Sequence, residues 1–452
     1  MLMLAAGVRG QGYQVQVVVE GLPEGMVALS GFHKTGYELL DSARSLNGTF
    51  YFHFDDFRSD GMYRIDLAKS GKDGEQQKFI EFIWAHESFE IYAQYDALSH
   101  TVSFTGSEEN RILGRFRDYE ERYEARMSML FPVIDRYPEQ DKFFGEAVEQ
   151  FVAIQEERNA FIDSLAEENA GSFAARIVET YRSVIVPPEI RGGDRIRFLQ
   201  EHYFELAPID DPALLNAPIY SRKIIDYLML YRNGNYSFSD QEDAFTEAVD
   251  MIMANVSGDP ELRSFVVEYL LEGFESFGME RIQTYIVDTY VDETCETDVV
   301  ELAVERVKGY RKMEEGQVTK DILIRSAGNE MIRLSEVDAD YTLLVFWASY
   351  CEHCQEMIPE LQEWYKEERP EGVEVFAVSI DSVKTDWVRY LESHNLPWIN
   401  AHEPMGWEGQ SAEDYNIYGT PTMFLLDRNR TIIARPFNLR ELRREIRKLK
   451  RR

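Results

Sequence analysis

The chain has 452 residues, of which 44% are apolar and 13% aromatic, so it can fill several hydrophobic cores and is too long for one. Its formal net charge is −33, from 81 acidic and 48 basic residues, and phosphate backbones repel a chain of this charge. We therefore expect a globular protein of about three domains that does not bind nucleic acid.

The chain contains only three cysteines, which are too few to stabilise the fold by a set of disulfides. No stretch is long and apolar enough to span a membrane, so no stable membrane span is expected. Residues 1–12 resemble the end of a secretory signal, although a charged region before the apolar run is missing. We expect export by a truncated or mis-started signal peptide, with an ordinary terminus as the alternative.

Residues 13–107 are predicted to form an all-β, sandwich-like domain. Apolar residues alternate in short runs that are bounded by turn residues, a pattern typical of strands. The runs lie at 14–19, 27–32, 49–54, 63–67, 87–95 and 101–104. Asn47-Gly48 is a strong signal for a hairpin turn.

Residues 108–315 are predicted to form a mostly α-helical domain. Ile112, Phe116 and Tyr119 open a series of apolar residues at helical spacing. Pro187-Pro188 interrupts the helical pattern. This region shows no fixed-period repeat and no spacing of metal ligands, so we predict no metal site.

Residues 316–452 are predicted to form an α/β domain, because strands and helices alternate there. The expected strands are 321–326, 342–348, 373–380, 422–427 and 431–434, with helices from 351, near 386–394 and at the end of the chain.

The chemistry of this last domain centres on Cys351-Glu352-His353-Cys354. An apolar run, 343–346, predicts a central strand just before it, and a helix is expected to start at Cys351. Unpaired N–H groups and the positive end of the helix dipole stabilise a thiolate at that place. The outer sulfur of Cys351 would attack a disulfide, and the more buried Cys354 would resolve the mixed intermediate.

Other uses of two cysteines at this spacing fit the sequence less well. Haem attachment needs a histidine where Gln355 stands, and zinc needs two further ligands that do not follow. A cysteine peroxidase normally lacks a partner three residues away. His353 favours a thiolate at the outer sulfur and Glu352 opposes it, so the pattern leaves the redox tuning open.

Two separated motifs resemble the thioredoxin family. Phe346–Cys354 is similar to its active-site motif, and Pro359 matches the proline that kinks its active-site helix. Gly419-Thr420-Pro421-Thr422 resembles the segment with the family's cis-proline. The lead-in at 321–335 and the insertion at 382–417 are similar to the exported thioredoxins of the TlpA and ResA type.

The resemblance implies a set of site residues. Pro421 would be cis, Thr420 would face the sulfurs, and both would join Trp347 and Tyr350 in the platform that binds substrate and tunes the pair. Val345 stands where cytoplasmic thioredoxins have a buried aspartate. Asp381 is a candidate proton acceptor, although a surface or helix-capping role is the more ordinary interpretation. No cofactor is implied.

Two functions fit the whole chain. In the first, the protein is a thiol–disulfide oxidoreductase of the periplasm or cell envelope, acting on protein thiols or disulfides and on a redox partner protein. In the second, it is an envelope interaction protein whose thioredoxin-like domain is mainly a docking module.

Overall fold

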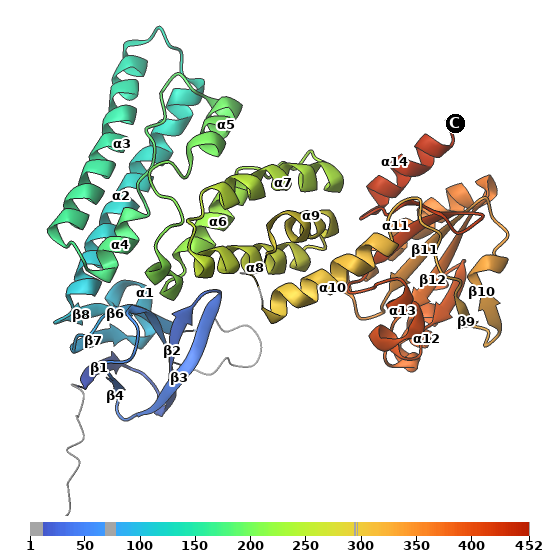
Figure 1. Ribbon diagram of the computed structural model, residues 1–452, viewed down its shortest axis with the longest axis horizontal. Coiled ribbons are helices and arrows are strands. Elements are labelled where there is room, and N and C mark those ends of the chain that lie inside the picture. Colours follow the sequence, from blue (N-terminus) through green and yellow to red (C-terminus); the bar gives the residue numbers. More distant parts are fainter. Residues whose placement is uncertain (1–11, 68–77, 293–294, 296, 452) are drawn as a thin grey trace, which may run out of the picture. The chain divides into compact units, whose positions relative to one another are not determined.

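The computed structural model describes residues 12–67, 78–292, 295 and 297–451, and the predicted signal-like segment lies outside these residues apart from Gly12. The chain forms two compact units (Figure 1). The first unit runs up to Asn233 and includes Ala244–Tyr269, and the second consists of Gly234–Asp243 and the chain from Leu270 onward. The domain boundaries predicted from the sequence stay predictions.

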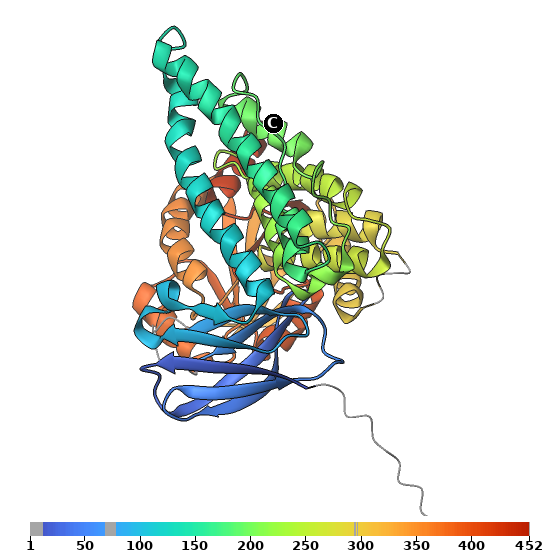
Figure 2. The same cartoon turned by 90° about the vertical axis from the view of Figure 1, so that its left-hand side faces the viewer.

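The first unit begins with a sheet-rich region. Its strands are β1 (Tyr13–Glu20), β2 (Gly25–His33), β3 (Gly36–Ser45), β4 (Thr49–Phe54), β5 (Gly61–Asp66), β6 (Phe79–Trp84), β7 (Phe89–Gln94) and β8 (Ser103–Thr105). They form two four-stranded sheets, in the orders β4-β1-β7-β8 and β3-β2-β5-β6. Figure 2 shows the two sheets stacked. Alternate side chains, such as Val15 and Val17 on β1, point into one core that both sheets share.

The turn at Asn47-Gly48 forms as predicted, but it does not join a hairpin within one sheet. Both residues have positive φ, and the backbone groups of Leu46 and Thr49 bond across the turn. The strands on either side then separate, since β3 pairs with β2 while β4 pairs with β1. Burial of the strand faces, rather than the turn, decides which strands pair.

The helical region follows directly on the sheets. Its helices in the first unit are α1 (Leu98–Thr101), α2 (Glu108–Arg136), α3 (Lys142–Glu168), α4 (Phe173–Glu179), α5 (Gly192–His202) and α6 (Ile219–Met229). Helices α2 and α3 lie side by side (Figures 1 and 2). The buried Asn110 side chain joins α2 to β6 by bonding both backbone groups of Ile83. The predicted interruption at Pro187-Pro188 is a non-helical segment between α4 and α5.

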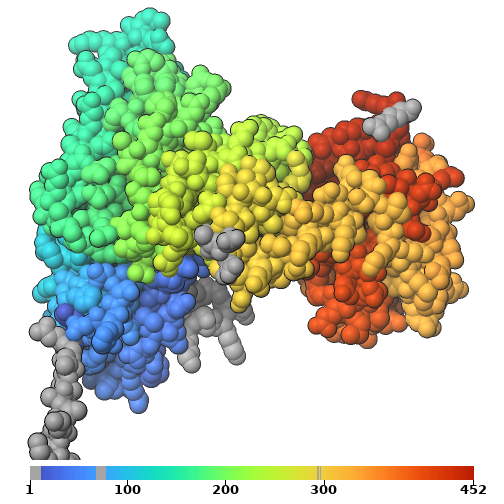
Figure 3. Space-filling model, viewed as in Figure 1, coloured from blue at the N-terminus to red at the C-terminus, as the bar shows by residue number. Residues whose placement is uncertain are grey.

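Helices α7 (Phe238–Ala254) and α8 (Pro260–Ser276) are divided between the two units. The second unit contains the first turns of α7, the end of α8, and all of α9 (Glu280–Tyr290) and α10 (Asp298–Lys312). The rest of it is the predicted α/β domain, against which α10 lies (yellow in Figures 1 and 3).

The α/β domain is built on one seven-stranded sheet, in the order β10-β9-β13-β12-β11-β14-β15. The strands are β9 (Leu323–Ser326), β10 (Met331–Arg333), β11 (Tyr341–Trp347), β12 (Val373–Ser379), β13 (Ile399–His402), β14 (Thr422–Asp427) and β15 (Ile432–Ala434). The helices are α11 (Glu352–Glu368), α12 (Lys384–His394), α13 (Gln410–Asp414) and α14 (Leu439–Leu449). The central strand β11 sends alternate side chains into two cores, one on each face, which explains its uninterrupted apolar sequence.

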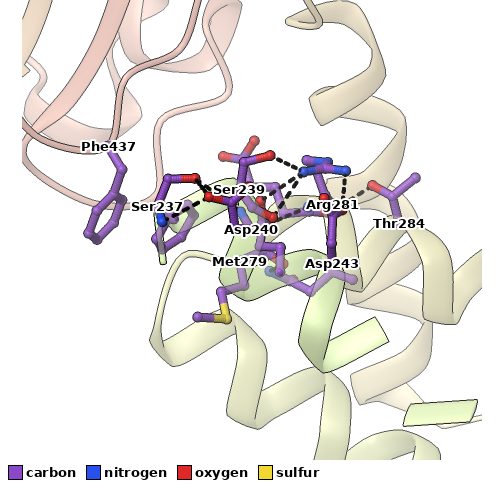
Figure 4. Close-up of polar contacts among 12 residues, drawn as sticks. Ser237, Ser239, Asp240, Asp243, Met279, Arg281, Thr284 and Phe437 are labelled. Carbon is purple, nitrogen blue, oxygen red and sulfur yellow. Dashed lines mark hydrogen bonds and ion pairs between the residues drawn. The ribbon is translucent and has the colours of Figure 1, made fainter. Parts of the chain in front are cut away.

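Helices α7 and α9 contact the α/β domain at their starts. The Phe238 ring at the start of α7 stacks on Phe437, with centroids 4.0 Å apart. Arg435 forms an ion pair with Glu280 at the start of α9. Between these helices Arg281 bonds Ser239 and Asp243, as Figure 4 shows.

Glu242 is buried between the starts of α7 and α9. Its carboxylate accepts a hydrogen bond from the Arg281 backbone N–H at 3.1 Å. Burial raises the pKa of Glu242 to about 7, although this hydrogen bond and the charge of Arg281 act in the opposite direction. The folded protein therefore holds this proton more tightly than the unfolded chain does, and the stability that the protonated carboxyl contributes is lost as the pH rises through about 7.

We expect Glu242→Gln, which keeps an acceptor oxygen without the charge, to stabilise the protein chiefly at high pH. The free energy of unfolding should rise by about 2 kcal/mol at pH 8 and by much less at pH 5. Urea denaturation followed by tryptophan fluorescence measures this, since most tryptophans lie in the second unit. Asp243→Asn on the same helix is the exposed control. The same effect of Glu242→Gln at both pH values would contradict the assignment.

Candidate active site

Cys351 lies where the central strand gives way to a helix, as the sequence predicts. Strand β11 ends at Trp347, and Cys351 is the N-cap residue of α11. Its Sγ accepts a hydrogen bond from the Cys354 backbone N–H at 3.3 Å. This is one of the N–H groups that a helix leaves unpaired in its first turn, and a negative sulfur would strengthen the bond.

The second cysteine is in a different environment. Cys354 is completely buried, whereas Cys351 is partly exposed. Burial, together with the neighbouring Cys351 sulfur, raises the pKa of the Cys354 thiol to about 12. The two sulfurs therefore divide the chemistry, because only Cys351 is accessible to another molecule and Cys354 keeps its proton at neutral pH.

The second sequence motif meets the first at the Cys351 sulfur. Cys351 Sγ lies 3.2 Å from the Thr420 carbonyl oxygen, to which the thiol donates. The peptide bond between Thr420 and Pro421 is cis, as the sequence predicts. The structure thus brings together residues that are 69 positions apart in the chain.

The remaining predicted site residues differ in how they are placed. Glu352, His353 and Tyr350 are exposed, so water screens the charges of the first two. Trp347 is only 1% exposed and packs edge-on against Tyr390, with ring centroids 5.1 Å apart. Trp347 can therefore act on the cysteines through packing, and its ring is not available to a substrate surface.

Asp381 is almost fully buried, at 1% exposed, and holds the turn that leads to Cys351. Its carboxylate accepts hydrogen bonds from the backbone N–H and the hydroxyl of Ser349 and from the Ser379 hydroxyl. His402 lies 2.8 Å from the Asp381 carbonyl oxygen. These contacts occupy both carboxylate oxygens and favour a positioning role, while the role of proton acceptor stays a prediction.

Sequence reasoning does not find Tyr390, which packs against the core that contains the buried Cys354. Burial raises the pKa of the Tyr390 phenol, and a negative charge on Cys354 would raise it further. The Tyr390 ring also stacks on His394 at 3.9 Å between centroids. No motif marks this residue, because α12 brings it to the site from the insertion.

No group of three His, Cys, Asp or Glu side chains is placed to hold a metal ion in the part of the chain that the structure describes.

Residues 316–435 match the AhpC/TSA family. The chain is 26% identical over 118 residues to thiol-disulfide oxidoreductase ResA of Oceanobacillus iheyensis, which covers 25% of this chain and 60% of that protein. It is 24% identical over 119 residues to the ResA of Bacillus subtilis, which covers 26% and 65%. Each match spans less than two thirds of the relative.

A solved domain of a possible thiol-disulfide isomerase from Cytophaga hutchinsonii is 27% identical, with a TM-score of 0.29, and the match covers 30% of this chain and 94% of that one.

The C-terminal part of this chain is therefore a thioredoxin-like domain of the AhpC/TSA family, and the relatives named above are thiol–disulfide oxidoreductases. The predicted resemblance and the predicted enzyme class are confirmed at the level of this domain.

The difference in burial between the sulfurs predicts selective alkylation of the reduced protein. We expect iodoacetamide at pH 8 to modify Cys351, and to leave Cys354 and the buried Cys295 unmodified while the protein is folded. Peptide mapping by mass spectrometry measures the modification of each cysteine, and the same reaction in urea is the control in which all three react. Equal labelling of Cys351 and Cys354 in the folded protein would contradict the assignment.

The contacts of Asp381 predict the effect of Asp381→Asn. This variant places an amide donor against the Ser349 N–H or the Ser379 hydroxyl, so we expect a loss of about 2 kcal/mol in stability. Disulfide exchange should slow by the same factor at every pH from 6 to 9, because the turn is displaced. The exposed Asp386→Asn serves as the control. If instead one of the pKa values in the pH–rate profile of the wild type is absent from that of the variant, Asp381 acts as the proton acceptor.

Proposed function

We propose that this protein exchanges thiols and disulfides with protein substrates in the cell envelope through Cys351 and Cys354. The observation that carries the proposal is the position of Cys351 Sγ, which lies between the Cys354 N–H and the Thr420 carbonyl oxygen. A partly exposed sulfur at a helix N-terminus, with a buried thiol one turn further on, suits nucleophilic attack followed by resolution.

The reduced protein would act in two steps. The Cys351 thiolate attacks one sulfur of a substrate disulfide, forms a mixed disulfide and releases the other substrate sulfur as a thiolate. Cys354 then loses its proton, for which the released thiolate is a base, and attacks Cys351 Sγ. The substrate leaves with both sulfurs reduced, and the two electrons that it gains come from the Cys351 and Cys354 thiols, which are oxidised to the Cys351–Cys354 disulfide. A redox partner protein restores the dithiol, and the reverse sequence oxidises a substrate.

The other site residues would support these steps. Thr420 and Pro421 provide backbone beside the attacking sulfur, and the exposed Tyr350 extends the surface that a substrate meets. Glu352 and His353 would tune the redox potential in opposite directions. No cofactor enters this reaction.

The proposed location rests on the resemblance to the exported TlpA and ResA group. Among the residues that the structure describes, none of the helices combines the length and the apolar character needed to cross a membrane. The alternative function, a docking module, needs neither sulfur, and the arrangement of both cysteines around one helix start favours exchange.

The order of attack predicts which variant captures substrates. In cells, Cys354→Ser should accumulate mixed disulfides through Cys351, because the resolving thiol is missing. Cys351→Ser should accumulate almost none, because Cys354 is buried. Non-reducing electrophoresis, with release by a reductant, measures the captured species. Capture of the same proteins by both variants, or by neither, would contradict the proposed roles.

A further inference from the structure

Helix α10 lies against the loop that carries the cis-proline. The loop runs from Asn416 to Pro421, and its Thr420 carbonyl oxygen contacts Cys351 Sγ at 3.2 Å. Within it the Tyr418 side chain is 54% exposed, two residues before Thr420. Helix α10 precedes residues 316–435, which match the family model, so this contact adds to the family's own domain.

Three residues on one face of α10 make the contact, at positions i, i+3 and i+4. The Arg306 guanidinium lies over the Tyr418 ring, 4.9 Å from its centroid. The Tyr310 ring meets Tyr418 edge-on, with centroids 6.5 Å apart. Gly309 lies so close to the Asn416 amide group that a Cβ at this position would collide with it. The absence of a side chain at Gly309 therefore allows the helix to approach the loop.

Arg306 is held in place for this contact. It forms an ion pair with Glu275 at the end of α8, and only 15% of its side chain is exposed. A guanidinium that is partly withdrawn from water and fixed by a carboxylate interacts with an aromatic face more strongly than a mobile surface arginine does. The position of the Tyr418 ring thus depends on a residue outside the α/β domain.

The helix itself is anchored at both of its ends. Val300, Val307 and Tyr310 are buried along one side of α10, and α9 packs beside it. Met313, just past the end of α10, is part of the core beneath the sheet. A helix fixed in this way can hold the Tyr418 ring in one place while a substrate binds.

We propose that Arg306 is a positioning residue that, through Tyr418, adapts the site to polypeptide disulfides in preference to small disulfides. The inference rests on the proposed exchange function. In this proposal a polypeptide that presents its disulfide to Cys351 lies along the cis-proline loop and over the exposed Tyr418 ring, which is two residues before Thr420. A small disulfide would need only the sulfur itself.

The test compares two chromogenic substrates with the same leaving group. One is a peptide of about ten residues, long enough to lie along the loop, whose cysteine carries thionitrobenzoate. The other is the small disulfide 5,5′-dithiobis(2-nitrobenzoate). Single-turnover rates of the reduced full-length protein give a half-saturation concentration and a limiting rate for each substrate.

For Arg306→Met we expect the half-saturation concentration for the peptide to rise about fivefold, with the limiting rate unchanged. The reaction with the small disulfide and the midpoint potential of the cysteine pair should not change. Arg306→Lys, which keeps the cation, should recover part of the loss. Arg311→Met is the matched control, because Arg311 lies on the same helix and pairs with Asp288.

Gly309→Ala provides a second, independent variant. Alanine favours the helix, so the variant is expected to fold, but its Cβ collides with the Asn416 side chain in the loop. We expect the loop to shift in response. The half-saturation concentration for the peptide should rise here too, again without a change for the small disulfide.

Three results would overturn the inference. In the first, Arg306→Met or Gly309→Ala binds the peptide as the wild type does. In the second, both substrates slow by the same factor and the potential shifts, which would show that α10 only stabilises the site. In the third, Arg311→Met has the same effect as Arg306→Met. If the wild type reacts with neither substrate, the proposed function itself fails, and that outcome is distinct from these three.

Discussion

The site depends on one hydrogen bond, from the Cys354 backbone N–H to the Cys351 sulfur. It exists because a buried strand ends at Trp347, four residues before Cys351, and a helix starts directly after Cys351. The first N–H groups of that helix have no partner within the helix, and the sulfur occupies the place of a capping oxygen. The same geometry places the second thiol one turn inside, where it is completely buried. One local arrangement thus separates an accessible nucleophile from a protected resolving thiol.

The surroundings hold this arrangement in place from two sides. On one side the buried Asp381 carboxylate fixes the Ser349 backbone, two residues before the outer cysteine. On the other side the cis-proline loop brings the Thr420 carbonyl to the same sulfur. A backbone carbonyl beside a thiol accepts a hydrogen bond from it. The same backbone would offer a substrate polar groups with which to form hydrogen bonds. The loop is in turn covered by α10, so part of the helical region is continuous with the active site.

The centre of the site could be predicted from the sequence, since both cysteines and the cis-proline belong to short motifs. The start of a helix at Cys351 follows from an apolar run and the motif after it. Asp381 and Tyr390 show the limit of such reasoning. Asp381 bonds Ser349, and Tyr390 packs against the core that contains Cys354. Both relations span tens of residues, and neither position has a local pattern that names its partner. Gly309 is similar, because a glycine inside a helix has an explanation only when Asn416 is seen beside it.

The fold, like the site, could be predicted from the sequence only in part. Periodicity located the sheet-rich, helical and α/β regions, because each buries its apolar residues at a regular spacing. Strand β3 escaped prediction, since its middle residues are exposed on both faces and do not alternate. The Asn47-Gly48 turn was predicted from the local sequence alone. The strands on either side of it belong to different sheets, and their buried faces determine which sheet each one joins.

The most direct test of this account is the redox equilibrium of the Cys351–Cys354 pair in the full-length protein. The oxidised fraction is measured by mass spectrometry after equilibration in graded thiol buffers and quenching with an alkylating agent. The account predicts one reversible two-electron transition, within the range of about −270 to −120 mV that thioredoxin-like oxidoreductases span. Substitution of Cys295 should not move it, and Cys351→Ser should abolish it. The absence of any reversible transition in the folded wild-type protein would contradict the exchange mechanism.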